Sequence, residues 1–198
     1  MTGRGRFIVL EGLDGVGKST QARRLAEGLG ARLTREPGGT PLGERIRALV
    51  LDHGVGDVAP RTEALLMAAA RAQHVAEAVG PALASGCDVV TDRYLYSSVA
   101  YQGYGRQLDP DAIRALSLWA VDGLEPDLVL LLEGPARLGH RIADRLEAED
   151  AAFHARVAAG YEAQLLADPA RWARVDAGGS EEATAAAVLA AVELRWAR

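Results

Sequence analysis

Residues 12–19 constrain the fold of this chain more than any other stretch. They read Gly-Leu-Asp-Gly-Val-Gly-Lys-Ser, so two glycines bracket four residues and a Lys-Ser pair follows the second glycine. This pattern is typical of a loop that binds phosphate groups, provided that a strand precedes it and a helix follows it. An apolar run over residues 7–10 comes before it and a helix-like stretch over residues 18–29 comes after it. The sequence therefore predicts a strand, a phosphate-binding loop and a helix in that order.

The residue types of this loop match the chemistry of a nucleoside triphosphate. Glycines at positions 12, 15 and 17 allow the backbone N–H groups to point inward at phosphate oxygens, and the helix N-terminus adds its dipole. Lys18 is placed to reach the β- and γ-phosphates, and Ser19 to ligate Mg²⁺. The alternative is a glycine-rich turn without a ligand. The predicted nucleotide-binding residues are Gly12, Leu13, Asp14, Gly15, Val16, Gly17, Lys18, Ser19 and Thr20.

Lys18 is also the only lysine, since the 22 basic residues are 21 arginines and this one lysine. The bias towards arginine is explained by nucleotide composition and indicates no site. The single lysine does indicate a site, because a compact ammonium on a flexible stem suits a phosphate loop better than a bulkier planar guanidinium.

Length and composition bound the remaining possibilities. The 198 residues suffice for a single α/β domain over 1–198, and 49% apolar with 25% charged residues excludes a disordered, collagenous or disulfide-rich chain. A net charge of −5 argues against a polycation that grips nucleic acid. Cys87 has no partner within the chain, which favours a reducing compartment, and no segment resembles a signal peptide or a membrane span. We expect a soluble, cytoplasmic protein.

Apolar runs alternate with helical stretches along the chain. Continuous apolar runs are typical of strands covered on both faces, so the alternation predicts a mostly parallel sheet between two layers of helices. Ligands of such folds lie beyond the carboxyl ends of the strands. The expected strands are at 7–10, 89–90 and 128–132, with weaker candidates at 32–34 and 174–175; the expected helices are near 18–29, 41–51, 61–84, 110–122, 148–167 and 181–196.

The phosphate loop leaves open what happens to the triphosphate. A small-molecule kinase competes with a switch GTPase or a related regulatory ATPase. A guanine-specific switch usually carries an Asn-Lys-x-Asp element, and this chain has none because its one lysine lies in the phosphate loop. A regulatory ATPase that acts on a protein partner remains an alternative.

Five motifs resemble those of the thymidylate kinase family, which transfers the γ-phosphoryl group of ATP to dTMP. They occur in family order over residues 7–165: Glu11 to Gln21, Thr34-Arg35-Glu36-Pro37-Gly38-Gly39-Thr40, Arg71-Ala72-Gln73-His74, Asp92-Arg93-Tyr94 with Ser97-Ser98 and Ala100-Tyr101-Gln102-Gly103, and Asp144-Arg145-Leu146-Glu147. The resemblance implies a P-loop kinase fold with a five-stranded parallel sheet and a mobile lid, ATP and dTMP as substrates, Mg²⁺, and a homodimer. A kinase for another nucleotide or deoxynucleoside is the nearest alternative.

Roles around the transferred group follow from this resemblance and from the strand ends. Asp14 would contact the 3′-hydroxyl of the acceptor, and Arg35, Glu36 and Pro37 would form a loop over its monophosphate. Asp92 and Arg93 end a strand, where an acidic group near Mg²⁺ and a cation near the transferred phosphoryl group are expected.

The acceptor base has its own set of residues. Met67 and Arg71 lie four apart on one helical face. In the family the matching arginine bonds the thymine carbonyl, and the residue at position 67 is usually a phenylalanine stacked on the base. Ser98, Tyr101 and Gln102 share another helical face, and the resemblance places them in the nucleoside pocket.

The lid is expected over about residues 136–148, where Arg137, Arg141 and Arg145 cluster. Arginines from a closing loop suit the task of stabilising charge on the moving phosphoryl group. One group of the family carries an arginine after the acidic residue of the phosphate loop, and another has glycine there and supplies arginines from the lid; Gly15 indicates the second group. Arg141 is the first choice for the catalytic lid arginine and Arg145 the second. The other predicted catalytic residues are Lys18, Arg93 and Asp14.

Overall fold

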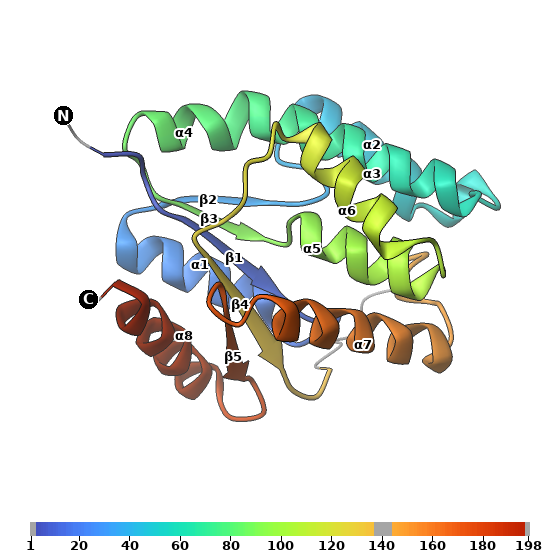
Figure 1. Cartoon of the computed structure of the whole chain (residues 1–198). Coiled ribbons are helices and arrows are strands. Elements are labelled where there is room, and N and C mark those ends of the chain that lie inside the picture. Colours follow the sequence, from blue (N-terminus) through green and yellow to red (C-terminus); the bar gives the residue numbers. More distant parts are fainter. Residues whose placement is uncertain (1–2, 137–143, 197–198) are drawn as a thin grey trace.

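The centre of the fold is a five-stranded sheet. The computed structural model describes residues 3–136 and 144–196 (Figure 1). All neighbouring strands are parallel, in the order β2-β3-β1-β4-β5, so the predicted fold class is confirmed. Both weaker strand candidates are part of the sheet. The strands are β1 (Phe7–Glu11), β2 (Arg32–Arg35), β3 (Val89–Asp92), β4 (Leu128–Glu133) and β5 (Trp172–Asp176).

Helices follow each of the strands. They are α1 (Lys18–Leu29), α2 (Pro41–Leu51), α3 (Pro60–His74), α4 (Gly80–Ala84), α5 (Leu95–Ser98), α6 (Pro110–Ala120), α7 (Ala151–Ala167) and α8 (Glu181–Trp196). The predicted helix at 61–84 corresponds to α3 and α4, joined by a π-helical turn at Val75–Val79. A second π-helical segment, Val99–Gly105, continues α5, so a helix covers a stretch that the strand–helix pattern left out.

The start of α7 shows how a single side chain sets a helix boundary. We expected this helix from about residue 148, but it begins at Ala151. Asp150 has an extended backbone and its carboxylate accepts a hydrogen bond from the N–H of Phe153 at 2.7 Å. An aspartate in this position satisfies a free N–H of the first turn, which fixes the start of the helix.

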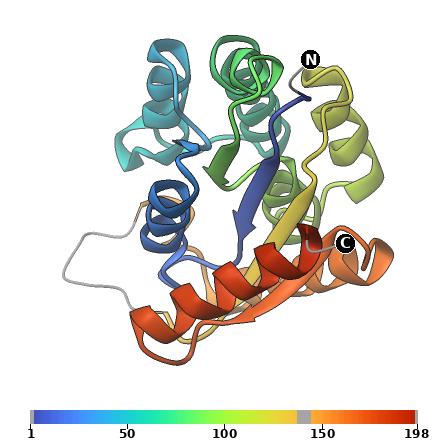
Figure 2. The same cartoon turned by 90° about the vertical axis from the view of Figure 1, so that its left-hand side faces the viewer.

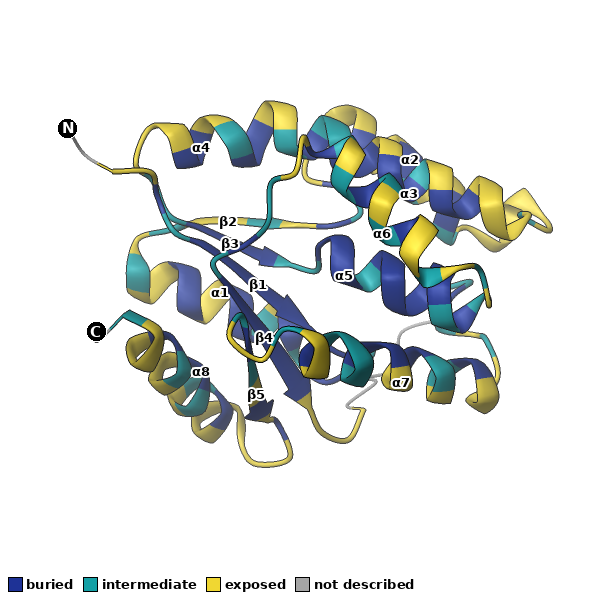
Figure 3. Cartoon of the chain, in the orientation of Figure 1, coloured by how far each residue is buried: buried dark blue, intermediate teal, exposed yellow. Residues whose placement is uncertain are grey.

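Alternating residues of β1 feed two separate cores. Phe7 and Val9 pack with the helices α2, α3, α4, α5 and α7 on one face of the sheet, and Ile8 and Leu10 pack with α1 and α8 on the other. Figures 1 and 2 show these two helical layers, and Figure 3 shows that β1, β3 and β4 are buried between them. No described helix is both long and apolar enough to span a bilayer.

The strand register brings polar residues together at the carboxyl ends of the strands. Leu10 of β1 and Arg35 of β2 both pair with Asp92 of β3. Because the strands are parallel, the loops that follow β1, β2 and β3 all lie at this end of the sheet. The three loops carry most of the residues that the sequence singles out.

Candidate active site

A cleft of about 480 Å³ opens at the carboxyl ends of the strands. It lies between the phosphate loop, the loop after β2 and the helices α2, α3 and α5. Its lining combines charged and polar side chains with apolar groups such as Met67 and the ring of Tyr101. From the predicted set it takes Asp14, Gly15, Gly17, Lys18, Ser19, Thr20, Arg35, Glu36, Pro37, Met67, Arg71, Asp92, Arg93, Ser98, Tyr101 and Gln102.

The phosphate loop has the backbone that its glycines predict. Gly12 has φ +139°, and a Cβ there would lie 2.4 Å from the carbonyl oxygen of Leu132. Gly17 has φ +96° at the start of α1. A side chain at either position would therefore be strained or would clash, which explains the glycines on local grounds.

Lys18 is buried at the base of this loop. The residue is 6% exposed, and its ammonium donates a hydrogen bond to the carbonyl oxygen of Leu13 at 2.7 Å. Burial, together with the nearby guanidinium of Arg93, lowers the pKa of Lys18 to about 8, against the opposing effect of Asp92 and Asp14. Because burial destabilises the charged ammonium, a bound anion such as a phosphate group would stabilise it strongly.

Ser19 and Asp92 meet across the gap between α1 and β3. The hydroxyl of Ser19 donates a hydrogen bond to Oδ2 of Asp92. The other carboxylate oxygen, Oδ1, is buried and has no hydrogen-bond partner among the described residues. A buried carboxylate oxygen without a partner is costly, so this pair presents a lone pair suited to a cation.

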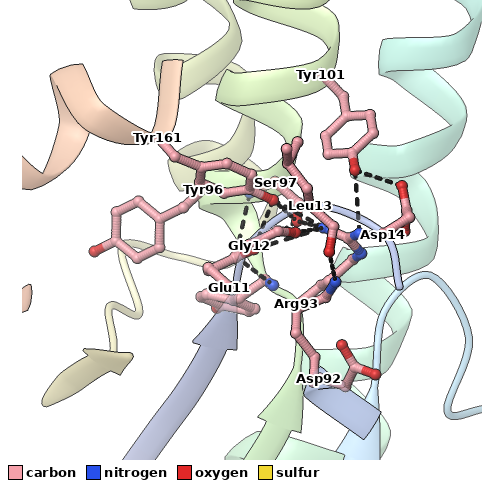
Figure 4. Close-up of polar contacts among 12 residues, drawn as sticks. Glu11, Gly12, Leu13, Asp14, Asp92, Arg93, Tyr96, Ser97, Tyr101 and Tyr161 are labelled. Carbon is pink, nitrogen blue, oxygen red and sulfur yellow. Dashed lines mark hydrogen bonds and ion pairs between the residues drawn. The ribbon is translucent and has the colours of Figure 1, made fainter. Parts of the chain in front are cut away.

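Arg93 is the most highly connected side chain of the site (Figure 4). Its φ of +71° is unusual for a residue with a side chain. The guanidinium donates to Oδ1 of Asp14 at 2.5 Å, to the carbonyl of Gly12 at 3.1 Å and to the hydroxyl of Tyr161 at 2.8 Å. Burial disfavours its charge, but the surrounding carboxylates raise the pKa of Arg93 well above its usual value.

Asp14 is held between Arg93 and Tyr101. The Tyr101 hydroxyl donates a hydrogen bond to Oδ2 of Asp14 at 2.6 Å, and the Arg93 guanidinium lies 5.0 Å from the centre of the Tyr101 ring. Although burial opposes it, the charges of Arg93 and Lys18 and the bond from Tyr101 lower the pKa of Asp14. Asp14 is therefore ionised at neutral pH and oriented towards the cleft.

Behind this group lies a buried carboxylate, Glu11. Its Oε2 accepts hydrogen bonds from the hydroxyls of Ser97 at 2.6 Å and Tyr161 at 3.0 Å, and both hydroxyls also bond Arg93. Burial raises the pKa of Glu11, while the charge of Arg93 opposes that rise. Glu11, Ser97 and Tyr161 thus form a hydrogen-bonded support for the guanidinium of Arg93 (Figure 4).

The loop after β2 supports Arg71 on α3. Oε2 of Glu36 accepts a hydrogen bond from Nε of Arg71 at 2.7 Å, and both side chains are 3% exposed. Oε1 of Glu36 is 2.9 Å from Nδ1 of His74, whose Nε2 is 2.6 Å from the hydroxyl of Thr34. Glu36 therefore orients Arg71, which also donates to Ser98 at 2.9 Å.

Arg47 on α2 is one of several cleft residues that were not among the predicted site residues. It donates a hydrogen bond to the carbonyl of Pro37 at 3.0 Å and lines the cleft close to Arg35. Burial and the neighbouring Arg35 lower the pKa of Arg47. The signal was available, because Arg47 adjoins the buried stripe of Gly43, Ile46 and Val50 on an otherwise exposed helix.

Not every predicted residue reaches the cleft. Gly12 and Leu13 contribute carbonyl oxygens to Arg93 and Lys18 instead, and Val16 packs in the core below α1. Arg35 lines the cleft but its guanidinium pairs with the exposed carboxylate of Glu44. The remaining predicted binding residues line the cleft together.

Of the three arginines expected in the lid, the structure describes only Arg145. Arg137 and Arg141 lie outside the described residues, as does most of the expected lid at 136–148. Arg145 is described and does not line the cleft. Its guanidinium pairs with the buried Glu63 of α3 at 2.5 Å and donates to the carbonyl of Val50 at 2.8 Å. Arg145 therefore ties the segment after residues 137–143 to α2 and α3.

Comparisons with known proteins agree with this geometry. The family model described as thymidylate kinase matches residues 10–188. A thymidylate kinase of Leifsonia xyli subsp. xyli is 57% identical, covering 93% of this chain and 92% of that protein. Another, of Alkalilimnicola ehrlichii, is 48% identical and covers 98% and 96%. The crystal structure of thymidylate kinase from Ehrlichia chaffeensis superposes with a TM-score of 0.81 at 29% identity, covering 96% of this chain and 99% of that one.

Both the sequence matches and the structural match extend over nearly the whole chain and therefore include all of the cleft. The chain belongs to the thymidylate kinase family.

Proposed function

We propose that the described cleft carries out the family's reaction. The chain is an enzyme that transfers the γ-phosphoryl group of ATP to dTMP, giving dTDP and ADP. One observation carries the assignment to this cleft: the phosphate loop with Lys18 and the buried Arg71–Glu36 pair open into the same cavity. A triphosphate and a second ligand can thus lie side by side there. Release of ADP that depends on added dTMP tests the proposal.

The charged residues divide the work of phosphoryl transfer. The acceptor is a phosphate oxygen, which is already anionic at neutral pH, so the reaction needs no strong general base. Catalysis then consists of positioning and of stabilising negative charge on the transferred group. Lys18 and Arg93 supply positive charge at the phosphates, and Asp14 holds Arg93 and orients the acceptor sugar.

The pair of Ser19 and Asp92 fits a magnesium ion. Oδ1 of Asp92, which has no hydrogen-bond partner among the described residues, belongs to the carboxylate that the Ser19 hydroxyl contacts, and oxygen atoms are the ligands that Mg²⁺ prefers. No cluster of three or more metal-binding side chains occurs within the described ranges 3–136 and 144–196, so nucleotide phosphates would have to provide the further ligands. When bound, Mg²⁺ neutralises part of the phosphate charge.

We assign recognition of the acceptor to residues of α3, of α5 and of the π-helical segment that follows it. Arg71, Ser98 and Gln102 provide polar contacts for the base, and Met67 provides an apolar surface. Methionine covers an aromatic face through its polarisable thioether, with a less defined geometry than a stacked ring. Tyr101, fixed by Asp14, lies where it limits the space at the sugar. The acceptor phosphate is assigned to Arg35 at the end of β2, Pro37 in the loop that follows, and Arg47 of α2.

Arg141 and Arg145 allow a direct comparison of the two lid candidates. Arg141→Ala is expected to lower kcat by about 10²–10³-fold and to spare dTMP binding, because a charge at the moving phosphoryl group acts mainly in the transition state. Arg145→Ala removes one of the two arginines that pair with the buried Glu63 and leaves Arg106 in place, which costs about 1.5–3 kcal/mol and lowers Tm by about 3–12 °C. Steady-state kinetics and thermal unfolding separate the two effects. An Arg141→Ala enzyme with unchanged kcat would remove Arg141 from the catalytic residues.

A homodimer is supported by the outer surface of three adjacent helices. Trp119 on α6 is 82% exposed, Leu65 on α3 is 57% exposed, and Leu42 and Leu49 of α2 are also exposed. Helix α3 contacts both α2 and α6, so the three helices form one layer (Figure 3). An exposed apolar surface of this kind is typical of an interface between copies.

Trp119→Glu is expected to convert the dimer into a monomer of 20.9 kDa, because a charge would be buried at the interface. Sedimentation velocity measures this change. Leu194→Glu on α8, where Leu194 is 72% exposed on the other face of the sheet, is the matched control and should remain dimeric. A wild-type protein that sediments as a monomer at micromolar concentration would contradict the homodimer.

The remaining proposals concern organisation and location. The two cores share one sheet, which supports a single kinase domain over residues 1–198 with a lid near 136–148. A single cysteine and the nucleotide substrates support a cytoplasmic location.

A further inference from the structure

Glu63, in the first turn of α3, is a fully buried carboxylate that receives donors from two other segments of the chain. Oε1 accepts hydrogen bonds from Nε2 of Gln102 at 2.9 Å and from Nε of Arg106 at 3.3 Å. Oε2 accepts from Arg106 at 3.1 Å and from Arg145 at 2.5 Å. Two guanidinium groups thus pair with the one carboxylate, and a further donor is the amide of a residue that lines the cleft.

The contact with Glu63 fixes which way the amide of Gln102 faces. A carboxylate accepts hydrogen bonds and donates none, whereas a glutamine side chain has a donor end and an acceptor end. Only the NH₂ group of Gln102 can therefore face Glu63. Gln102 is 1% exposed and lines the cleft, so the polar group that it offers to a ligand there is its carbonyl oxygen.

We propose that Glu63 is a positioning residue for base selection, acting through Gln102. It holds the carbonyl oxygen of Gln102 towards the acceptor base, where that oxygen accepts the ring N–H of thymine or uracil. This inference rests on the proposed function of the cleft and adds the means by which pyrimidines are told apart.

The chemistry of the two pyrimidine types gives the expected preference. Thymine and uracil have a ring N–H between two carbonyl groups, which matches an acceptor from Gln102 next to a donor from Arg71. Cytosine has a ring nitrogen lone pair and an amino group at these positions, so both contacts would become mismatched. A buried polar group left without a partner costs about 10–100-fold in affinity, which is enough to reject dCMP.

Glu63→Gln reverses this arrangement without changing the shape of the side chain. Arg106 and Arg145 both donate to the Oε2 position, so the carbonyl oxygen of the introduced glutamine should occupy that position. Its NH₂ group then faces Gln102, whose amide must rotate and present its own NH₂ group to the cleft. We expect kcat/KM for dTMP and dUMP to fall together by about 10–100-fold, mainly through the KM of the acceptor. The KM for ATP and the value for dCMP should change much less.

Two further variants complete the test. Glu63→Asp retains the carboxylate and should keep the wild-type ratio of dTMP to dCMP activity. Gln102→Leu leaves Glu63 in place and should also lower dTMP and dUMP activity together while sparing dCMP, so it decides the matter if Glu63→Gln does not fold. Equal losses for dTMP, dUMP and dCMP in Glu63→Gln, or in Gln102→Leu, would overturn the positioning role. A wild-type enzyme without preference for dTMP would instead contradict the proposed function.

Discussion

Replacing Lys18 with methionine is expected to lower kcat by about 10²–10³-fold, because one preorganised positive charge at the phosphates is lost. Methionine has nearly the same length and is apolar, so it fits a position that is 6% exposed and leaves the phosphate loop folded. The rate of ADP release at saturating ATP and dTMP measures the loss, and thermal unfolding checks the fold.

Lys18→Arg separates the charge of this residue from its shape. The guanidinium keeps the charge but is larger and planar, and the ammonium of Lys18 already lies 2.7 Å from the carbonyl of Leu13. We therefore expect most of the activity to be lost here as well. Near-normal activity in Lys18→Arg would mean that the single lysine of the chain is an accident of composition.

The same residue predicts a pH dependence of ATP binding. The pKa of Lys18 is about 8 in the free enzyme, so its ammonium is charged below this pH and becomes neutral above it. Affinity for ATP should consequently fall as the pH rises through 8, as measured by calorimetry. Lys18→Arg, whose charge does not titrate in this range, should bind ATP with a flat profile.

Arg93→Met is the second variant with a large expected effect. Arg93 pairs with Asp14, and if it also faces the transferred phosphoryl group as proposed, its loss should lower kcat by about 10²–10³-fold. The change also removes the counterion of the buried Glu11 and one of the two cations near Asp14, at a cost of about 3–5 kcal/mol in the free energy of unfolding. Activity must therefore be measured well below the Tm of the variant.

Two controls distinguish catalysis by Arg93 from its structural role. Arg93→Lys keeps a positive charge but lacks the planar fork that bonds Asp14, Gly12 and Tyr161 together, so kcat should still fall strongly while more stability is retained. Tyr161→Phe removes the hydroxyl that accepts a hydrogen bond from Arg93 and donates one to Glu11, and it should lower kcat by only about 2–10-fold because the guanidinium itself remains. A wild-type kcat in Arg93→Lys would contradict the assignment of Arg93 to the transition state.

Much of the fold follows from local patterns in the sequence. The strands β1 and β4 are continuous apolar runs and both are buried along nearly all of their length, so their prediction needed no tertiary information. Strand β2 is mostly exposed and was only a weak candidate, because it lies at the edge of the sheet. The spacing of Ser98, Tyr101 and Gln102 indicated one helical face, but it did not indicate that Val99–Gly105 would be π-helical rather than α-helical.

The candidate site was predictable to the extent that it follows the ends of the strands. Asp92 and Arg93 are found where a parallel sheet places the residues at the end of β3, and Ser19 meets Asp92 as the phosphate-loop pattern implies. Contacts between distant segments were not predictable. Glu63 resembles an ordinary first-turn acidic residue in the sequence, and only the tertiary structure shows that it pairs with Arg106 and Arg145.

The most direct test of the account is a coupled measurement of ADP release by the wild-type protein with Mg²⁺ and ATP. The acceptors are dTMP, dUMP, dCMP, dGMP and thymidine, each supplied separately, with a reaction that lacks acceptor as the reference. We expect rapid ADP release with dTMP, weaker release with dUMP, and little with the other three. ADP release that proceeds at the same rate without any acceptor would contradict a kinase and favour a hydrolytic ATPase.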